Sequence, residues 1–222
     1  MRQKSPSSLQ ATLFMSPKSE PLFPLLRIAR LRMELDGEGV TSLIAGAGCP
    51  LACRWCLNAA VLRQPPTPVT AQELYDRVKI DDLYFRATGG GVTFGGGEAL
   101  LHAAFFRAFR EVCGDNWHIC AETSLHVPRG LVEAAAETVD GFIIDIKDMN
   151  SEIYRRYTGG DAGLVQENLA YLLDKVGPER LLVRVPLIPD FNTPVDCDAS
   201  EQRLRAMGVT RIDRFSYIRR EV

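Results

Sequence analysis

Apolar stretches of strand length alternate with amphipathic stretches of helix length along this chain from Leu25 onward. Buried strands give short apolar runs, whereas helices give an apolar stripe that repeats every three to four residues. On this basis strands are predicted at residues 40–45, 92–94, 117–123, 141–146, 180–188 and 212–218. Helices are predicted at residues 70–80, 101–112, 129–138, 151–157, 164–176 and 199–207. The chain therefore reads as about six consecutive β/α units.

The order of these elements predicts the fold class. Alternating strands and helices imply a parallel sheet with right-handed crossovers. The nearly continuous apolar run at 141–146 is typical of a strand buried on both faces. About six units are too few for a closed eight-unit barrel of roughly 250 residues. We therefore predict an α/β fold that forms a partial, open TIM-type barrel, with ligands bound at the carboxyl ends of its strands.

Composition and charge narrow the class of protein. The chain has 222 residues, 46% of them hydrophobic, and a net charge of −2. These values fit a globular domain and exclude a disordered chain. No uncharged apolar run reaches the ~18 residues of a transmembrane helix. The near-neutral charge gives no electrostatic reason to expect nucleic acid or an anionic membrane as a partner.

The N-terminal part of the chain differs from the rest. It is rich in Ser, Pro, Gln and Lys, and it lacks the apolar core of a signal peptide. We predict a flexible tail at residues 1–24, followed by one domain at residues 25–222. Clustered thiols without an export signal indicate a reducing compartment, so we predict a cytoplasmic location.

Three cysteines form a C-x3-C-x2-C loop directly after the first predicted strand, namely Cys49, Cys53 and Cys56. Structural zinc sites usually have four ligands in two C-x2-C pairs, and this chain has no second pair. An iron–sulfur cluster normally takes four thiolates, so a cluster held by three leaves one iron open to another ligand. The alternative is that these cysteines are small buried residues of a turn.

A glycine-rich stretch surrounds the second predicted strand at residues 89–97 and is followed by Glu98. Glycines at a strand end let the backbone approach a ligand closely. The Lys-Ser/Thr ending of a phosphate loop is missing. Two interpretations remain, a flexible turn before a helix or a binding loop in which Glu98 pairs with a ligand ammonium group.

Together these motifs resemble the radical S-adenosylmethionine (SAM) superfamily. More narrowly, the chain resembles the glycyl-radical-enzyme activases, the group that includes pyruvate formate-lyase activating enzyme. The similarity covers about residues 31–217, essentially the whole predicted domain. Besides the cysteine loop, it rests on five segments, DGEG at 36–39, GGVTFGGGE at 90–98, CAET at 120–123, IDIKDMN at 144–150 and VRVPLIP at 183–189.

The resemblance implies a chemistry and the residues that serve it. It implies that Cys49, Cys53 and Cys56 hold a 4Fe–4S cluster whose open iron is chelated by the amino and carboxylate groups of SAM. In this family the reduced cluster cleaves SAM, and the 5′-deoxyadenosyl radical abstracts a hydrogen atom. The further cofactor-binding residues that it implies are Trp55, Leu57, Gly96, Gly97, Glu98, Glu122, Asp145, Lys147 and Arg184.

Some of these positions have two interpretations. Trp55 stacks on the adenine or packs in the core. Asp145 and Lys147 lie two residues apart at the end of a buried strand and face the same side. They contact the methionine and ribose of SAM, or they form an internal ion pair. Arg184 reaches the SAM carboxylate or is the partner of a buried acid.

The chain also departs from the family's pattern. Glu122 and Thr123 match the Asp-Thr region that, with the Asp of the next strand, helps to hold a monovalent cation in the pyruvate formate-lyase activase, but Glu is longer. Leu57 stands where activases often have a polar residue, and Ile218 stands where a cofactor-contacting His is usual. The segment 56–70 is too short for the ferredoxin-like insert of many activases, so one cluster is expected.

The favoured function is an activase that removes a hydrogen atom from a backbone glycine of a glycyl radical enzyme, which is its protein partner. The family implies a flavodoxin or a ferredoxin as the electron donor. Two alternatives stay open, a radical SAM enzyme that acts on another substrate and a non-catalytic module that binds a metal cluster.

Overall fold

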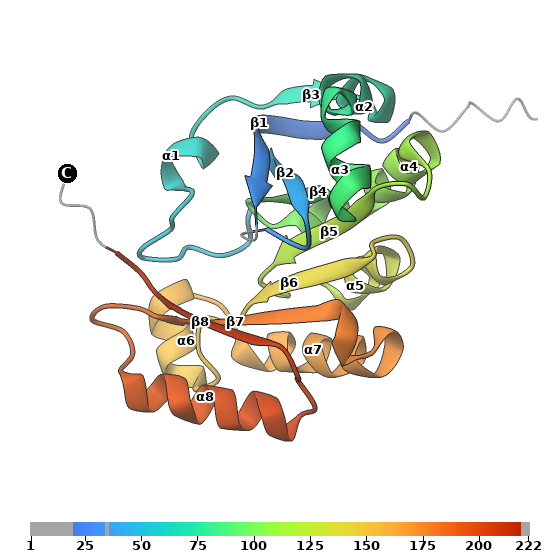
Figure 1. The fold of residues 1–222 in the computed structure, drawn as a ribbon. Helices are drawn as coiled ribbons and strands as arrows, with labels where there is room; N and C mark the ends of the chain where they lie inside the picture. Colours follow the sequence, from blue (N-terminus) through green and yellow to red (C-terminus); the bar gives the residue numbers. More distant parts are fainter. Residues whose placement is uncertain (1–19, 34–35, 219–222) are drawn as a thin grey trace, which may run out of the picture.

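The computed structural model describes residues 20–33 and 36–218, so most of the predicted tail lies outside the described residues. An eight-stranded sheet runs through these residues in the order β3-β1-β2-β4-β5-β6-β7-β8 (Figure 1). Its strands are β1 (Phe23–Met33), β2 (Val40–Gly46), β3 (Thr67–Val69), β4 (Gly91–Gly96), β5 (His118–Thr123), β6 (Gly141–Asp145), β7 (Leu181–Leu187) and β8 (Ile212–Ser216).

Six of these strands are parallel to their neighbours, namely β2, β4, β5, β6, β7 and β8. They are the six strands predicted from the sequence, and the open, mostly parallel sheet confirms the predicted fold class. β1 and β3 were not predicted and extend the sheet as antiparallel strands beside β2. β1 begins at Phe23, whose side chain is buried, so the predicted tail boundary at residue 24 falls inside a strand.

Helices follow most of the parallel strands, as predicted. In the described residues the α-helices are α1 (Ala59–Leu62), α2 (Ala71–Val78), α3 (Asp82–Thr88), α4 (Ala103–Cys113), α5 (Arg129–Ala136), α6 (Ser151–Thr158), α7 (Ala162–Val176) and α8 (Pro194–Ala206). Short 3-10 helices cover Lys79–Asp81, Ala99–His102 and Pro178–Arg180. α1 and α3 were not predicted. None of the described helices has the length and apolarity needed to cross a bilayer.

The predicted start of α2 is confirmed in detail. The Thr70 hydroxyl accepts a hydrogen bond from the Glu73 amide at 3.2 Å, and the Glu73 carboxylate accepts one from the Thr70 amide at 2.8 Å. This reciprocal pair satisfies two amides that the first helical turn leaves without partners.

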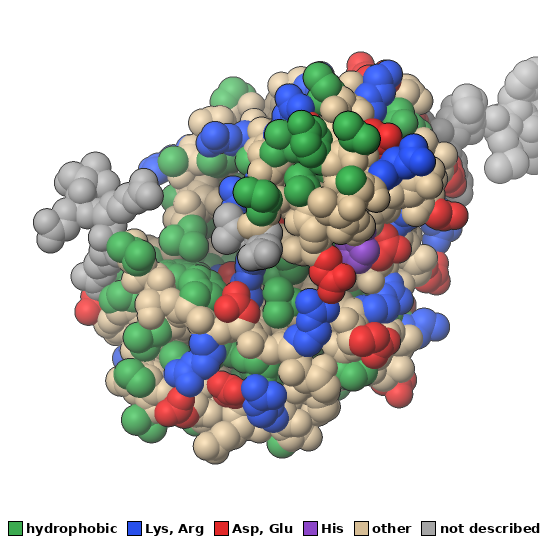
Figure 2. All heavy atoms as spheres, viewed as in Figure 1, with side chains coloured by type: hydrophobic (Ala, Val, Ile, Leu, Met, Phe, Trp, Pro, Cys, Tyr) green, Lys and Arg blue, Asp and Glu red, His purple; other side chains and the backbone are tan. Residues whose placement is uncertain are grey.

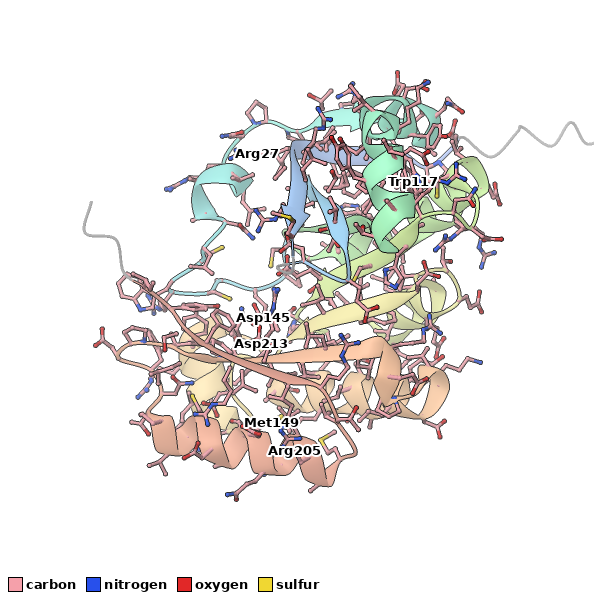
Figure 3. The ribbon with its side chains drawn as sticks, in the orientation of Figure 1. Arg27, Trp117, Asp145, Met149, Arg205 and Asp213 are labelled. Carbon is pink, nitrogen blue, oxygen red and sulfur yellow. The ribbon has the colours of Figure 1, made fainter. Side chains whose placement is uncertain are left out.

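The alternation of side chains along the strands separates an apolar side of the sheet from a polar one. Phe94, Ile144 and Val183 face the helices and are fully buried in one apolar core. The residues between such positions, including Asp145 and Arg184, face the inside of the open barrel, where Figure 3 labels Asp145. The sheet thus carries its charged residues toward one enclosed space.

Candidate functional site

A cavity of about 500 Å³ lies inside the open barrel at the carboxyl ends of the parallel strands. All twelve residues that the sequence predicts to hold the cluster or the cofactor line this cavity, namely Cys49, Cys53, Trp55, Cys56, Leu57, Gly96, Gly97, Glu98, Glu122, Asp145, Lys147 and Arg184. They come from the loop after β2, from the ends of β4, β5 and β6 or just beyond them, and from the middle of β7. The fold therefore collects them in one place, while their roles toward a ligand stay predictions.

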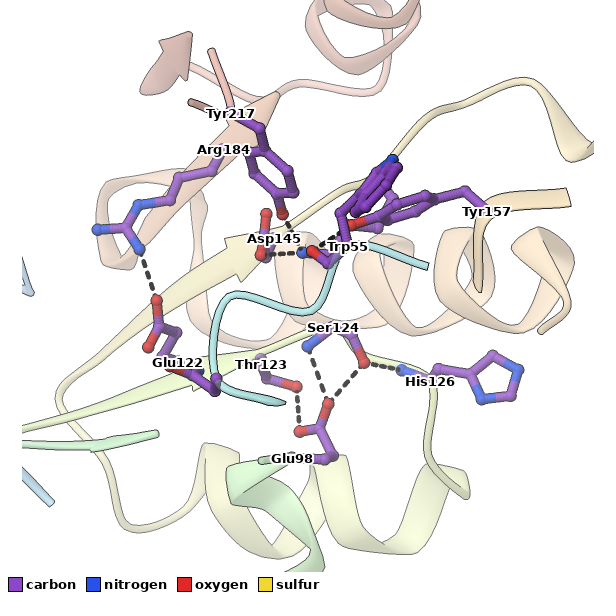
Figure 4. Close-up of polar contacts among 12 residues, drawn as sticks. Trp55, Glu98, Glu122, Thr123, Ser124, His126, Asp145, Tyr157, Arg184 and Tyr217 are labelled. Atoms are coloured by element: carbon purple, nitrogen blue, oxygen red, sulfur yellow. Dashed lines mark hydrogen bonds and ion pairs between the residues drawn. The ribbon is translucent and has the colours of Figure 1, made fainter. Parts of the chain in front are cut away.

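The cysteine loop is fixed to the end of α6. The Ala52 amide donates to the Thr158 carbonyl at 2.9 Å, and the Arg54 amide donates to the Tyr157 carbonyl at 3.0 Å. The Tyr157 hydroxyl in turn donates to the Trp55 carbonyl at 3.0 Å (Figure 4). Because α6 offers its last carbonyls as acceptors, the loop crosses the mouth of the cavity with a defined backbone.

The thiols on this loop suit a metal cluster. All three are free, and burial raises the pKa of Cys49 and raises that of Cys53 to about 11. Thiolates rather than thiols bind metals, so cluster assembly must remove these protons. Within residues 20–33 and 36–218, no three His, Cys, Asp or Glu side chains are grouped closely enough to hold a single metal ion. Three free sulfur ligands that border one cavity fit a 4Fe–4S cluster with one iron left open.

The glycine-rich turn after β4 lies against the start of the cysteine loop. The Gly97 amide donates to the Gly46 carbonyl at 3.1 Å, and the Glu98 amide donates to the Gly48 carbonyl at 2.8 Å. A Cβ atom added to Gly97 would lie 2.0 Å from the Gly48 carbonyl oxygen, so no larger residue fits this position. The glycine is therefore required by a close backbone approach.

Glu98 lies at the cavity within a network of hydrogen bonds. Its side chain is buried, and its carboxylate accepts hydrogen bonds from the hydroxyls of Thr123 and Ser124, both at 2.6 Å. It also accepts from the amides of Ser124 at 2.9 Å and Leu100 at 3.2 Å (Figure 4). With these four donors around its carboxylate, Glu98 is held in place, and its predicted pairing with a ligand ammonium group stays a prediction. Glu98 ties the turn after β4 to the end of β5.

Asp145 and Lys147 form the internal ion pair that the sequence left as one of two possibilities. Nζ of Lys147 also donates to the Tyr217 hydroxyl at 3.0 Å. Burial alone would lower the pKa of Lys147, but the Asp145 carboxylate and the Tyr217 hydroxyl hold it well above its ordinary value. Oδ1 of Asp145 is buried and has no hydrogen-bond partner in the described residues, so it can accept a bond from a ligand.

Glu122 and Arg184 form a second ion pair across the strand ends. Nη1 of Arg184 donates to Oε1 of Glu122 at 2.6 Å, and Nε of Arg184 lies 3.7 Å from Oδ2 of Asp213. Burial raises the pKa of Glu122, and Arg184 opposes that shift. Of the two interpretations of Arg184, the structure shows the partner of a buried acid.

Sequence reasoning missed several residues of the cavity, among them Arg32, Asp36, Asn58, Tyr157 and Tyr217. Tyr217 could have been found, because it lies two residues after the cavity-lining Phe215 and alternation places both on one side. Ile218, the position compared with the family's His, is 84% exposed. The last strand therefore presents Tyr217, not residue 218, to the cavity.

Comparison with known proteins agrees with this arrangement. Residues 43–193, more than half of the chain, match the radical SAM superfamily. The chain is 27% identical over 218 residues to the (2S)-3-sulfopropanediol sulfolyase activating enzyme of Bilophila wadsworthia, covering 71% of this chain and 72% of that enzyme. It is 30% identical over 192 residues to the pyruvate formate-lyase 1-activating enzyme of Escherichia coli, covering 82% of this chain and 76% of that enzyme.

The fold is also shared with a solved structure. Streptococcus suis SuiB bound to S-adenosylmethionine superposes with a TM-score of 0.60 at 12% identity. The match covers 77% of this chain and 39% of that longer protein. At this low identity it shows a shared fold and nothing more. The cavity, its three thiols and the family match lead to one identification. This chain is a member of the radical SAM superfamily, whose radical chemistry uses a 4Fe–4S cluster and SAM, and its relatives are activating enzymes of glycyl radical enzymes.

Proposed function

We propose that this chain is an activase that removes a hydrogen atom from a backbone glycine of a glycyl radical enzyme. The observation that carries the proposal is that the cysteine loop, the glycine turn and the charged strand ends border one cavity. The two relatives named above are activating enzymes, and this chain matches them over most of their length, which supports the same function. The cytoplasmic location predicted from the sequence belongs to this proposal.

Cys49, Cys53 and Cys56 hold the cluster in this proposal. When bound, the reduced cluster supplies the electron that splits SAM into methionine and a 5′-deoxyadenosyl radical, which takes a hydrogen atom from the substrate. Asp145 accepts a hydrogen bond from the nucleotide through its unpartnered Oδ1, and Lys147 fixes the orientation of that carboxylate. The walls of the cavity keep water from the reacting atoms.

The charge of the cavity suits a cationic ligand. Acids outnumber bases in its lining, which contains Asp36, Glu98, Glu122, Asp145 and Asp213 against Arg32, Lys147 and Arg184. SAM carries a sulfonium and an ammonium group against one carboxylate. An excess of negative charge in a cleft with low-dielectric walls raises the local concentration of such a cation.

The rim of the cavity suits a protein substrate. Trp55 and Leu57 line the cavity and are 43% and 67% exposed, and Ile218 stands exposed beyond the end of β8. In the view of Figure 2, apolar side chains gather on the surface beside the ends of β8 and α6. Exposed apolar groups around a polar cavity are typical of a protein-binding surface. In this proposal, a glycine loop of a partner protein binds against these apolar side chains and reaches the cavity.

The test is anaerobic reconstitution with iron and sulfide, followed by addition of dithionite and SAM. Two partner proteins are supplied, pyruvate formate-lyase and (2S)-3-sulfopropanediol sulfolyase. We expect 5′-deoxyadenosine, measured by chromatography, and a glycyl radical on a partner, measured by electron paramagnetic resonance. A Cys53→Ser variant serves as the control and should give neither signal. Reduced flavodoxin or ferredoxin then replaces dithionite to test the proposed electron donor.

Each other outcome selects an alternative. Formation of 5′-deoxyadenosine without a radical on either partner shows radical SAM activity and contradicts activation of these two enzymes, so the substrate is another glycyl radical enzyme or another molecule. A protein that binds iron but forms no 5′-deoxyadenosine is a non-catalytic cluster-binding module.

A further inference from the structure

The residues expected to hold a monovalent cation do not fit one. The resemblance assigns this cation to Glu122 and Thr123 together with the Asp of the next strand, which is Asp145. A cation site needs several oxygen atoms that are free to turn toward the ion. In this chain most of those oxygens already serve other groups.

Glu122 is already neutralised by a fixed positive charge. Its Oε1 accepts from Nη1 of Arg184 at 2.6 Å, and the two side chains are 24% and 15% exposed. Arg184 also lies 3.7 Å from Asp213, so one guanidinium connects residues of β5, β7 and β8. A metal cation bound to Glu122 would stand close to this guanidinium and be repelled by it.

The other two expected ligands are engaged as well. The Thr123 hydroxyl donates to Glu98 at 2.6 Å and accepts from the Leu125 amide at 2.9 Å. Oδ2 of Asp145 is paired with Lys147. Oδ1 of Asp145 and Oε2 of Glu122 are left, and each belongs to a carboxylate that is already paired with a fixed cation, so the two do not make a site for a further one.

Arg184 lies where its charge acts on the same part of the cavity as Asp145. The two residues are partners in the register of β6 and β7, and both line the cavity. Arg184 pairs with Glu122 and Lys147 pairs with Asp145, so each acid has its own base. With Oδ2 engaged in this way, Asp145 presents Oδ1, the acceptor that the proposed function assigns to the nucleotide.

We propose that Arg184 is a built-in counter-ion that takes the place of the monovalent cation in this chain, so that SAM binding requires neither K⁺ nor Na⁺. Arg184 is a positioning residue, because it acts through Glu122 and Asp145. The effect on SAM binding rests on the proposed function. The replacement of a cation by the Arg184 guanidinium is a property of the folded chain and can be tested without SAM.

The first measurement uses cluster-free protein. Thermal unfolding is followed in KCl, NaCl and tetramethylammonium chloride at equal ionic strength, since the last cation is too large for a carboxylate site. The midpoint of the wild type should be the same in the three salts. The midpoint of Arg184→Ala should be higher in KCl or NaCl than in tetramethylammonium chloride, because a small cation can then occupy the space beside Glu122.

The second measurement is the dissociation constant of SAM for reconstituted protein in the same salts. The wild type should vary by less than twofold. Arg184→Ala should bind at least tenfold more weakly in tetramethylammonium chloride and recover affinity in KCl or NaCl. Arg107→Ala, which removes an exposed ion pair with Glu137 on the helical side, is the matched control and should behave as wild type.

The outcomes separate the two proposals. A wild type that loses SAM affinity at least fivefold without K⁺ and Na⁺, or an Arg184→Ala protein that unfolds at the same temperature in all three salts, overturns the counter-ion. Failure of the wild type to bind SAM in any salt contradicts the proposed function, while the unfolding measurement still decides the counter-ion. If Arg184→Ala does not fold, the wild type decides by itself. A midpoint of wild-type unfolding that depends on K⁺ or Na⁺ overturns the counter-ion proposal.

Discussion

Cys53 illustrates how the cavity changes the chemistry of a single side chain. Burial raises the pKa of its thiol from the ordinary 9.0 to about 11. The folded chain thus holds this proton more tightly than the unfolded chain does. The resulting contribution to stability is complete below pH 9 and is lost as the pH rises from 9 to about 11.

The pKa of Cys53 predicts how its reactivity depends on pH in the cluster-free protein. Only the thiolate reacts with iodoacetamide, so the rate should rise about tenfold per pH unit from pH 7 to 10 without a plateau. Mass spectrometry of the Cys53 peptide after timed alkylation measures this rate. A synthetic peptide of residues 49–56 is the control, and its rate should be half-maximal near pH 9 and level off above it. A plateau for the folded protein below pH 9 contradicts the prediction.

At the residue scale, the sequence predicted which residues lie at the site more successfully than it predicted the hydrogen-bond partner of each. The motifs and the family resemblance that they carry predicted Cys53 and Asp145 for one site, and the structure places both at the cavity, where loops and strand ends of parallel units converge. The sequence did not show the hydrogen bonds of Glu98, since Ser124 and Leu100 reach it through tertiary packing. Hydrogen-bond partners of this kind depend on side-chain geometry that no periodic pattern records.

At the scale of elements, the contact between β2 and β4 governs the shape of the site. The two strands are parallel neighbours, and their ends carry the cysteine loop and the glycine turn. Gly97 sits where the glycine turn meets the start of the cysteine loop, with no room for a Cβ atom. Side-chain volume at this position therefore affects the distance between the two halves of the predicted cofactor site.

Gly97→Ala should weaken SAM binding at least tenfold and destabilise the fold by about 1–3 kcal/mol, because its new Cβ overlaps the Gly48 carbonyl. Equilibrium dialysis and urea unfolding measure the two effects. Gly130→Ala is the matched control, because Gly130 is in α5 and an added Cβ meets nothing within 4 Å. It should leave SAM binding unchanged and stabilise the fold by about 0.4–1 kcal/mol. Equal SAM affinities for the two variants contradict the role given to Gly97.

The elements that the sequence missed are those without a full period. β3 has three residues and α1 has four, which is too short for either an alternating or a helical pattern to show. β1 contains Pro24 and a bulge between Ala29 and Arg32, so its apolar residues do not alternate regularly. Tertiary partners rather than local preference place these segments.

At the scale of the whole molecule, contacts around the cavity join parts of the chain beyond the hydrogen bonds of the sheet. The cysteine loop contacts α6, and the glycine turn contacts β5 through Glu98. A cluster held by the three thiols adds bonds within the cysteine loop and so fixes it further. Because it binds only the folded arrangement, it must stabilise the entire domain.

Loading the cluster should raise the midpoint of thermal unfolding by about 5 °C or more. Circular dichroism of anaerobic samples before and after reconstitution measures the shift. Removal of the iron with a chelator should return the midpoint to that of the cluster-free protein. Cys53→Ser should show no shift under either treatment. A wild-type midpoint that stays constant on loading would mean that the thiols do not hold the metal in the folded state.

The attachment of the cysteine loop to α6 has a consequence for local motion. Two loop amides use the carbonyls of the last helical turn as acceptors, so the loop cannot lift away unless both hydrogen bonds break. Exchange of iron with solvent, and entry of oxygen to the sulfurs, are then limited by the rate at which this pair of bonds opens rather than by the faster fluctuations of an untethered loop.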